Sequence, residues 1–138
     1  MTDNSLLCSK YVQKILEDNE EVKAILGNDE HKIFTLQQPD TLTFPYIVHS
    51  RSSLTVQYTK SLAAGIGWVN EVVYSIKCVS NDYMQCIDLA NAVRHAMEGY
   101  RIRNENICIE PIQLIQASEY PWDDNCFVEE LQFRLQIK

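Results

Sequence analysis

VVYSIKCVSNDYMQCIDLANAVRHAMEG, residues 72–99, joins the pattern of a strand directly to the pattern of a helix. In the first part, every second side chain is apolar, which predicts a strand with one face on a core. The opposite side of that strand is half polar, with Ser75 and Lys77 among its residues. The strand is expected to run from Trp68 to Val79, and the apolar side carries Val72, Tyr74, Ile76 and Cys78.

The second part predicts the best-defined helix of the chain. Asp82 is a favourable N-cap residue, and Gln85 stands three positions later, as in a capping box. Gly99 follows at the position where a left-handed residue ends a helix. The expected apolar stripe comprises Tyr83, Cys86, Ile87, Ala90, Val93 and Met97.

Before this unit, a second amphipathic helix is predicted over residues 4–26. An acidic stretch at 17–21 favours a break, with Asn19 capping the second piece and Gly27 with Asn28 ending it. Strand patterns cover the rest of the chain. They span His31–Leu36, an extended run from Phe44 into a long hairpin at about 51–69, Ile107–Ser118, and a closing strand that alternates from Phe127 to Ile137 and is interrupted at Glu129.

The element order predicts an α+β fold of order α-β-β-β-α-β-β in a single domain over residues 1–138. Hairpin-like links between strands favour a largely antiparallel sheet, with two helices on one face. One helical layer would leave the other face of the sheet partly uncovered.

Composition narrows the class of protein. The net charge is −7, from 19 acidic and 12 basic residues, and the basic residues are scattered, so a nucleic-acid-binding surface is disfavoured. No basic start with an apolar run precedes the first helix, and no apolar stretch approaches the length of a membrane span, so the expected compartment is a cytosol and no membrane partner is expected. The five cysteines have irregular spacing and are predicted to be reduced, small apolar side chains.

The residues capable of chemistry form no recognisable motif. His31, His49 and His95 stand apart, and Asp123 with Asp124 has no further ligands at calcium-loop spacing. We therefore expect no catalytic residue, no cofactor and no metal, and a protein that is not an enzyme.

Two segments carry apolar side chains outside the expected core. These are Leu54, Val56, Leu62, Ile66 and Trp68 in the long hairpin, and Tyr120 and Trp122 in the last loop. They either fold back over the bare sheet face or pack on another subunit, since aromatic residues are enriched in interfaces. If the hairpin is an interface, Trp68→Ala should reduce assembly and leave the fold of the monomer intact.

Taken in order, the segments resemble one known family over about residues 5–138: the tail-completion (tail-terminator) proteins of long-tailed bacteriophages and prophages. The resemblance lies in residue class and order. The segments that carry it are Val22–Gly27, Ile33-Phe34, Phe44-Pro45-Tyr46-Ile47-Val48, Glu71–Ile76, Tyr83–Met97 and Phe127–Ile137.

This resemblance implies a structural subunit that assembles as a ring, commonly a hexamer, at the head-proximal end of the tail. The ring would terminate growth of the tail tube and form the head–tail joining surface, with the tail-tube protein and a head-completion or connector protein as partners. It would occupy the virion tail after assembly in the host bacterial cytoplasm, and DNA would pass through it without specific binding.

Two other interpretations stay open. One is a small-molecule-binding or enzymatic α+β domain with its site on the open sheet face, where a pocket would involve His49, Tyr74 or Arg134. The other is a different head–tail connector or a baseplate component of a secretion system.

Overall fold

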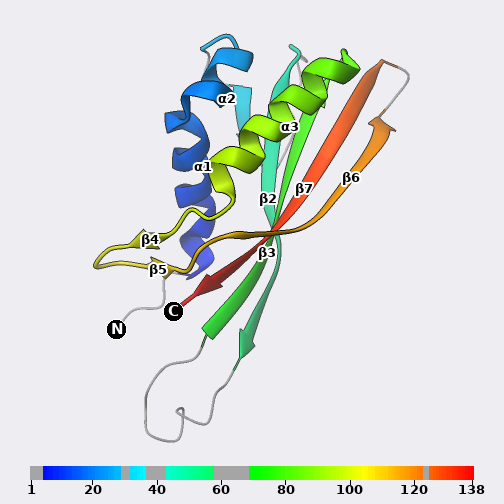
Figure 1. The fold of residues 1–138 in the computed structure, drawn as a ribbon. Helices are drawn as coiled ribbons and strands as arrows, with labels where there is room; N and C mark the ends of the chain where they lie inside the picture. Colours follow the sequence, from blue (N-terminus) through cyan, green and yellow to red (C-terminus); the bar gives the residue numbers. More distant parts are fainter. Residues whose placement is uncertain (1–4, 29–31, 37–42, 58–68, 123–124) are drawn as a thin grey trace, which may run out of the picture.

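The computed structural model describes residues 5–28, 32–36, 43–57, 69–122 and 125–138. The fold is mixed α+β, with its helices and strands in an order close to the expected one (Figure 1). In chain order the elements are η1 (Ser5–Leu7), α1 (Cys8–Asp18), α2 (Glu20–Ile25), β1 (Ile33–Thr35), β2 (Tyr46–Gln57), β3 (Val69–Ser80), α3 (Tyr83–Met97), β4 (Ile102–Arg103), β5 (Cys108–Ile109), β6 (Gln113–Trp122) and β7 (Cys126–Ile137).

The strands form a seven-stranded sheet in the order β1-β2-β3-β7-β5-β4, and β6 also pairs with β7. All pairs are antiparallel except β1 with β2, so the expectation of a largely antiparallel sheet is confirmed with one parallel exception. Two strands pair with the same edge of β7. β5 pairs with it only at Ile137, and β6 pairs with it from Arg134 back to Cys126. The expected strand over 107–118 is therefore two strands. The short strand β4 was not expected.

The helices cover one face of the sheet, as predicted, and α3 lies across β3 and β7 (Figure 1). The alternation read from the sequence places the side chains correctly: the even-numbered residues of β3 from Val72 to Cys78 are fully buried. The core between the helices and the sheet includes Val12, Leu16, Val22, Val72, Tyr74, Ile76, Leu89, Val93, Met97, Phe133 and Leu135.

Local signals set the helix ends. Asn19 separates α1 from α2, and its side chain accepts a hydrogen bond from the Val22 N–H at 3.0 Å. Gly27 and Gly99 have φ values of 74° and 81°, the left-handed conformation that ends a helix with no Cβ strain. These three expectations are confirmed.

The start of α3 differs from the expected capping box. The Asp82 side chain caps the helix through the Met84 N–H at 3.1 Å, but Gln85 does not return to the Asp82 backbone. Instead the Asp82 N–H donates to Ser80 Oγ at 3.1 Å, and the Ser80 hydroxyl donates to Gln85 Oε1 at 2.7 Å. The hydroxyl of the buried Ser80 therefore lies between the Asp82 N–H and the Gln85 side chain and bonds to both.

Two aromatic residues assigned to apolar stripes are not buried. Tyr83 is 42% exposed and Phe127 is 39% exposed, and their rings meet edge to face with centroids 5.7 Å apart. Tyr83 is the first residue of α3 and Phe127 is the second residue of β7, so both lie at the end of the fold where these elements begin.

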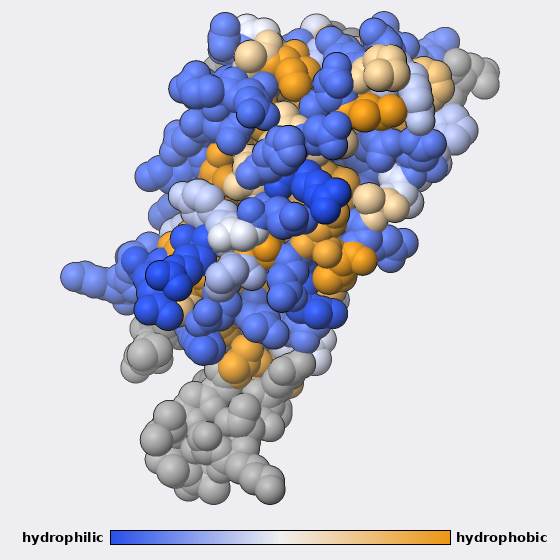
Figure 2. Space-filling model, viewed as in Figure 1, coloured by the Kyte–Doolittle hydropathy of each residue, from blue (hydrophilic) through white to orange (hydrophobic). Residues whose placement is uncertain are grey.

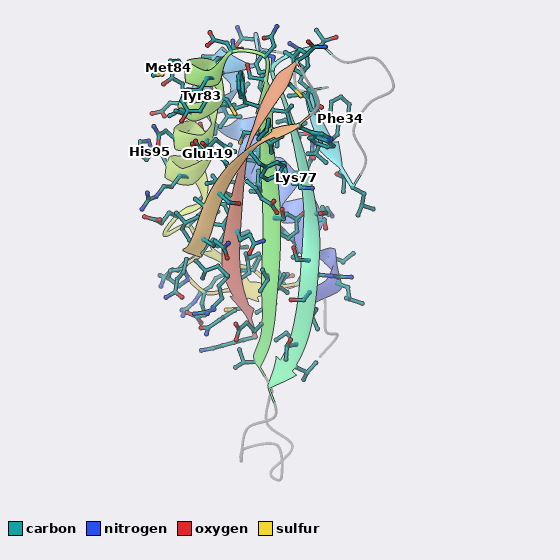
Figure 3. The ribbon with its side chains drawn as sticks, turned by 90° about the vertical axis from the view of Figure 1, so that its right-hand side faces the viewer. Phe34, Lys77, Tyr83, Met84, His95 and Glu119 are labelled. Atoms are coloured by element: carbon teal, nitrogen blue, oxygen red, sulfur yellow. The ribbon has the colours of Figure 1, made fainter. Side chains whose placement is uncertain are left out.

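The face of the sheet away from the helices carries a smaller apolar cluster at one end. Its buried members are Tyr46, Val48, Val79, Cys126 and Val128. Phe34, Phe44, Tyr120 and Trp122 pack around them, half-buried. Figure 3 shows Phe34 and Lys77 on this side of the sheet. The expectation that this face is partly uncovered is confirmed, and aromatic side chains cover one end of it.

Candidate functional site

A groove runs along the flank of α3, between that helix and the hairpin of β6 and β7. It consists of two hollows, of about 280 Å³ and about 210 Å³, which share Glu129. The floor and walls are mostly apolar, with Cys86, Pro121 and Phe127 in one hollow and Ile87, Leu114 and Leu131 in the other. Figure 2 shows apolar patches between hydrophilic residues in this part of the surface. We call this feature the α3–β6 groove.

Apolar side chains on the elements that border the groove remain in solvent. Tyr83, Met84 and Phe127 are 42%, 59% and 39% exposed, and Ile115 on β6 is 39% exposed. Ile115 is exposed because a bulge between Leu114 and Gln116 removes it from the pairing register with β7. Clustered apolar exposure of this kind is typical of a surface that contacts another protein.

Two carboxyl groups stand opposite each other inside this apolar setting. Glu119 on β6 is the direct cross-strand partner of Glu129 on β7. The Tyr83 hydroxyl donates to the Glu119 carboxylate, at 2.9 and 3.1 Å from its two oxygens. Figure 3 shows Tyr83, Met84 and Glu119 on the α3 side of the sheet. The acidic pair is thus held at a fixed place in the groove.

The close approach of the two carboxyl groups separates their proton affinities. Burial, followed by the hydrogen bond and the charge of Glu119, raises the pKa of Glu129 to about 7. Hydrogen bonds from Glu129 and then from Tyr83 lower the pKa of Glu119. Near pH 7 Glu119 is therefore ionised and Glu129 is partly ionised, and the negative charge of the pair grows as the pH rises. Such a groove favours a cationic occupant.

Beside the groove, β6 forms a long edge of the sheet. Among the described strands it pairs only with β7, over its ten residues. An edge strand presents unpaired backbone groups, and proteins protect such edges or pair them with a partner. The one bulge and Pro121 interrupt this edge, but most of its length is available for contact.

His49, one of the residues expected in a pocket under the small-molecule interpretation, is a structural residue of the core. It is fully buried, and its Nδ1 lies 2.6 Å from the Tyr74 hydroxyl. Its Nε2 contacts Gln13 Oε1, and the Gln13 amide nitrogen donates to Glu17 and to the Ile33 carbonyl. This orientation of Gln13 assigns the proton to Nε2, so Nδ1 accepts from Tyr74. Burial lowers the pKa of His49 to about 4, so the ring is neutral at pH 7.

The remaining groups capable of chemistry form no metal-binding cluster among the described residues. His95 is exposed, with Nδ1 3.7 Å from a Glu21 oxygen, and His31, Asp123 and Asp124 lie outside the described residues. Within the described part of the chain, no three His, Cys, Asp or Glu side chains are placed to hold a metal ion, and no helix is both long and apolar enough to span a membrane.

The cysteines behave as apolar side chains, as predicted. All five are free thiols, and four of them are buried. The Cys86 thiol donates to the Cys78 carbonyl at 3.2 Å, and burial raises its pKa to about 11. Such a thiol is protonated at neutral pH and is a poor nucleophile.

The expected interface residues fall in three places. Leu54 and Val56 are half-buried on β2, and Leu54 packs against the main core. Tyr120 and Trp122 pack on the smaller cluster, and Lys77 Nζ lies 5.6 Å from the centre of the Trp122 ring. Leu62, Ile66 and Trp68 lie outside the described residues. An interface role for these seven residues stays a prediction.

Sequence reasoning did not find the α3–β6 groove. One signal for it was visible: Glu129 interrupts an otherwise apolar face of the closing strand. Its partner Glu119 comes from a strand whose register with β7 was not known, so the acidic pair could not be inferred. The groove consequently appears only when α3, β6 and β7 are placed together.

No protein-family model and no curated protein sequence matches the chain. Among solved structures, it has the same fold as a chain described as "Virion of native gene transfer agent (GTA) particle". The TM-score is 0.76 at 15% sequence identity, and the match covers 91% of this chain and 90% of that chain. The likeness extends over nearly the whole of both chains, and at this identity it establishes a shared fold.

Proposed function

We propose that this chain is a structural protein of a phage or phage-like virion, and that it acts in completion of the tail. The observation that carries the proposal is the fold shared with a virion chain over 91% of this chain and 90% of the other. A match of nearly equal extent on both sides leaves little in either chain outside the shared fold. The resemblance to tail-completion proteins in residue order supports the same class of function.

In this role, copies of the chain form a ring at the head-proximal end of the tail. The ring, a hexamer in the form that the resemblance implies, terminates tail-tube growth and presents the head–tail joining surface. Its partners are the tail-tube protein and a head-completion or connector protein. The long free edge of β6 and the apolar groove beside it support a function of contact with neighbours.

The charge of the chain suits a passage for DNA. With a net charge of −7, a ring of such subunits would not retain the phosphate backbone. DNA could therefore pass through the opening with no specific binding by the protein.

The described geometry favours this function over a small-molecule site. The two hollows, about 280 and 210 Å³, are open and smaller than typical ligand pockets of about 300–1,000 Å³. On the sheet face away from the helices, Arg134 is paired with Glu71 at 3.0 Å, while His49 and Tyr74 are buried on the helix side. None of the three residues expected in such a pocket lines either hollow.

The proposal is tested by removing the protein from the particle that carries it. A nonsense mutation in the coding sequence, introduced into the phage or prophage, should give filled heads without tails and tubes of abnormal length in electron micrographs. Expression of the wild-type chain in trans should restore joined particles of normal tail length. Normal particles from the mutant would refute the proposed function.

A further inference from the structure

The β4–β5 hairpin is a pre-formed projection on the side of the molecule opposite the tip of the β6–β7 hairpin (Figure 1). Asn104 Oδ1 fixes its turn by accepting hydrogen bonds from the Asn106 and Ile107 N–H groups at 2.8 and 2.9 Å. Ile107 and Ile109 anchor it in the core, with 4% and 1% exposure. A segment ordered in this way loses little conformational entropy when it binds.

The free face of this hairpin is basic. Arg101 and Arg103 are both exposed, and because they are two residues apart in an extended segment, they project from the same side while Ile102 faces inward. Two other cations are already paired: Lys138 with Glu110 at 3.1 Å, and Arg94, which lines the groove from α3, with Glu98 at 3.1 Å.

The hairpin therefore offers two guanidinium groups to a partner. Glu105 in the turn is its one carboxylate, and Tyr100 at its base adds an aromatic ring that is 46% exposed.

One hollow of the α3–β6 groove has the complementary composition, while Arg94 lines the other hollow. It offers the paired carboxyl groups of Glu119 and Glu129, with the exposed rings of Tyr83 and Phe127 beside them. Arginine binds carboxylates through a planar fork of donors and packs on aromatic rings, so this setting suits a guanidinium group. The half of the groove that holds Tyr83 and Glu119 lies near the tip of the β6–β7 hairpin, at the end opposite the β4–β5 hairpin, so a single chain is unable to bring the two together.

We propose that the β4–β5 hairpin of one copy docks in the α3–β6 groove of the next copy, with Arg101 and Arg103 facing Glu119 and Glu129. Each copy then contacts one neighbour through its hairpin and the other neighbour through its groove, which is a head-to-tail contact. Contacts of this type close into rings when the rotation between copies allows it. The inference rests on the proposed function for its ring, and it specifies the surfaces that make the ring.

Charge reversal tests this contact in the purified full-length chain. One variant carries Arg101→Glu and Arg103→Glu, and the other carries Glu119→Lys and Glu129→Lys. Each variant alone opposes like charges at the contact, so its self-association should weaken at least tenfold in light scattering and sedimentation. A matched control with Lys14→Glu and Lys23→Glu has the same change in net charge as the arginine variant and should associate like wild type.

Mixing the two variants gives the decisive readout. The glutamate-bearing hairpin of the first variant complements the lysine-bearing groove of the second. The arginine hairpin of the second variant complements the unchanged acidic groove of the first. The mixture should therefore assemble with the two variants alternating and in equal numbers. Circular dichroism of each variant alone should match wild type, which separates loss of contact from loss of fold. If one variant is unfolded, cross-linking mass spectrometry of the wild-type chain tests the contact instead. Links are expected between residues 101–103 of one copy and Glu119 or Glu129 of another copy.

Three results would overturn the inference: wild type that stays monomeric up to its solubility limit, reversal variants that assemble normally, or a mixture that does not recover. None of these depends on particle morphology. A mutant phage with long, unjoined tails alongside a failed charge-reversal test would support the proposed function and reject this contact. Normal particles alongside a rescued mixture would reject the function and support the contact.

Discussion

The carboxyl group of Glu129 carries an electrostatic penalty that substitution by glutamine should remove. Burial, and then the hydrogen bond and charge of Glu119, raise the pKa of Glu129 from 4.5 to about 7. A carboxyl group with a higher pKa in the folded chain binds more protons folded than unfolded between these two values. The stability contributed by this group is therefore full below about pH 4.5 and is lost as the pH rises through about 7.

The size of the effect follows from the same two values. The difference between 4.5 and about 7 corresponds to an upper limit of about 3 kcal/mol, at about 1.4 kcal/mol per pH unit. Solvent screens this partly exposed carboxyl group, so we expect about 1 kcal/mol. Glu129→Gln keeps the shape of the side chain and its ability to donate to Glu119. It should raise the free energy of unfolding by about 1 kcal/mol near pH 8 and leave it unchanged near pH 4.

Urea denaturation followed by circular dichroism, repeated across this pH range, measures the effect. Glu130→Gln is the matched control, because the next residue of the same strand lies on the opposite face. Burial alone would raise the pKa of Glu130, but hydrogen bonds from Ser75 at 2.8 Å and Tyr120 at 3.0 Å outweigh it and lower the pKa. The control should therefore lose stability near pH 8. A Glu129→Gln protein that is destabilised near pH 8, or changed equally at every pH, would refute the reasoning.

Three further predictions concern the scaffold. Burial lowers the pKa of His49 from 6.5 to about 4, so its stabilising contribution is full above pH 6.5 and is lost as the pH falls toward 4; His49→Gln should flatten this acid limb of a stability–pH profile, and an unchanged limb would contradict the buried network. Asn19→Ala removes the cap of α2 and should lower the unfolding free energy by about 1 kcal/mol in urea titrations, with Asn19→Asp close to wild type; equal losses in both would argue against the cap. Gly99→Ala meets no atom within 4 Å but must adopt a φ of 81°, so its free energy of unfolding in urea titrations should fall by the backbone strain alone, about 1–2 kcal/mol, and no fall would mean that the backbone there relaxes.

The parts of the fold that the sequence predicted are those set by local chemistry. Alternation from Val72 to Cys78 fixes which face of β3 is buried, because strand side chains point to opposite faces in turn. Asn19 and Gly99 end or begin helices through bonds and backbone angles within a few residues. Such features need no knowledge of distant segments, and they were predicted correctly.

The features that were missed depend on distant segments. β1 runs parallel to β2 through the pairs from Ile33 with Ile47 to Thr35 with His49, and no local pattern distinguishes parallel from antiparallel pairing for three residues. The exposure of Tyr83 and Phe127 depends on where the helical layer ends over the sheet. Periodicity predicts which side of an element is apolar, but it does not predict whether a neighbour covers that side.

The candidate site belongs to this second group. Glu119 and Glu129 are ten positions apart, and only the bulge after Leu114 and the register of β6 on β7 bring them opposite each other. The basic hairpin was likewise missed, because β4 and β5 have two residues each, too few for a periodic signal. Neither of the two surfaces proposed to meet in assembly carries a chemical motif that the sequence alone would reveal.

Immunogold electron microscopy of intact particles tests the central claim most directly. Antibody raised against the purified chain should label one position, the junction between head and tail, and should leave the capsid shell and the length of the tube free. Particles without label, or label spread along the tube or over the shell, would contradict a tail-completion role for this protein.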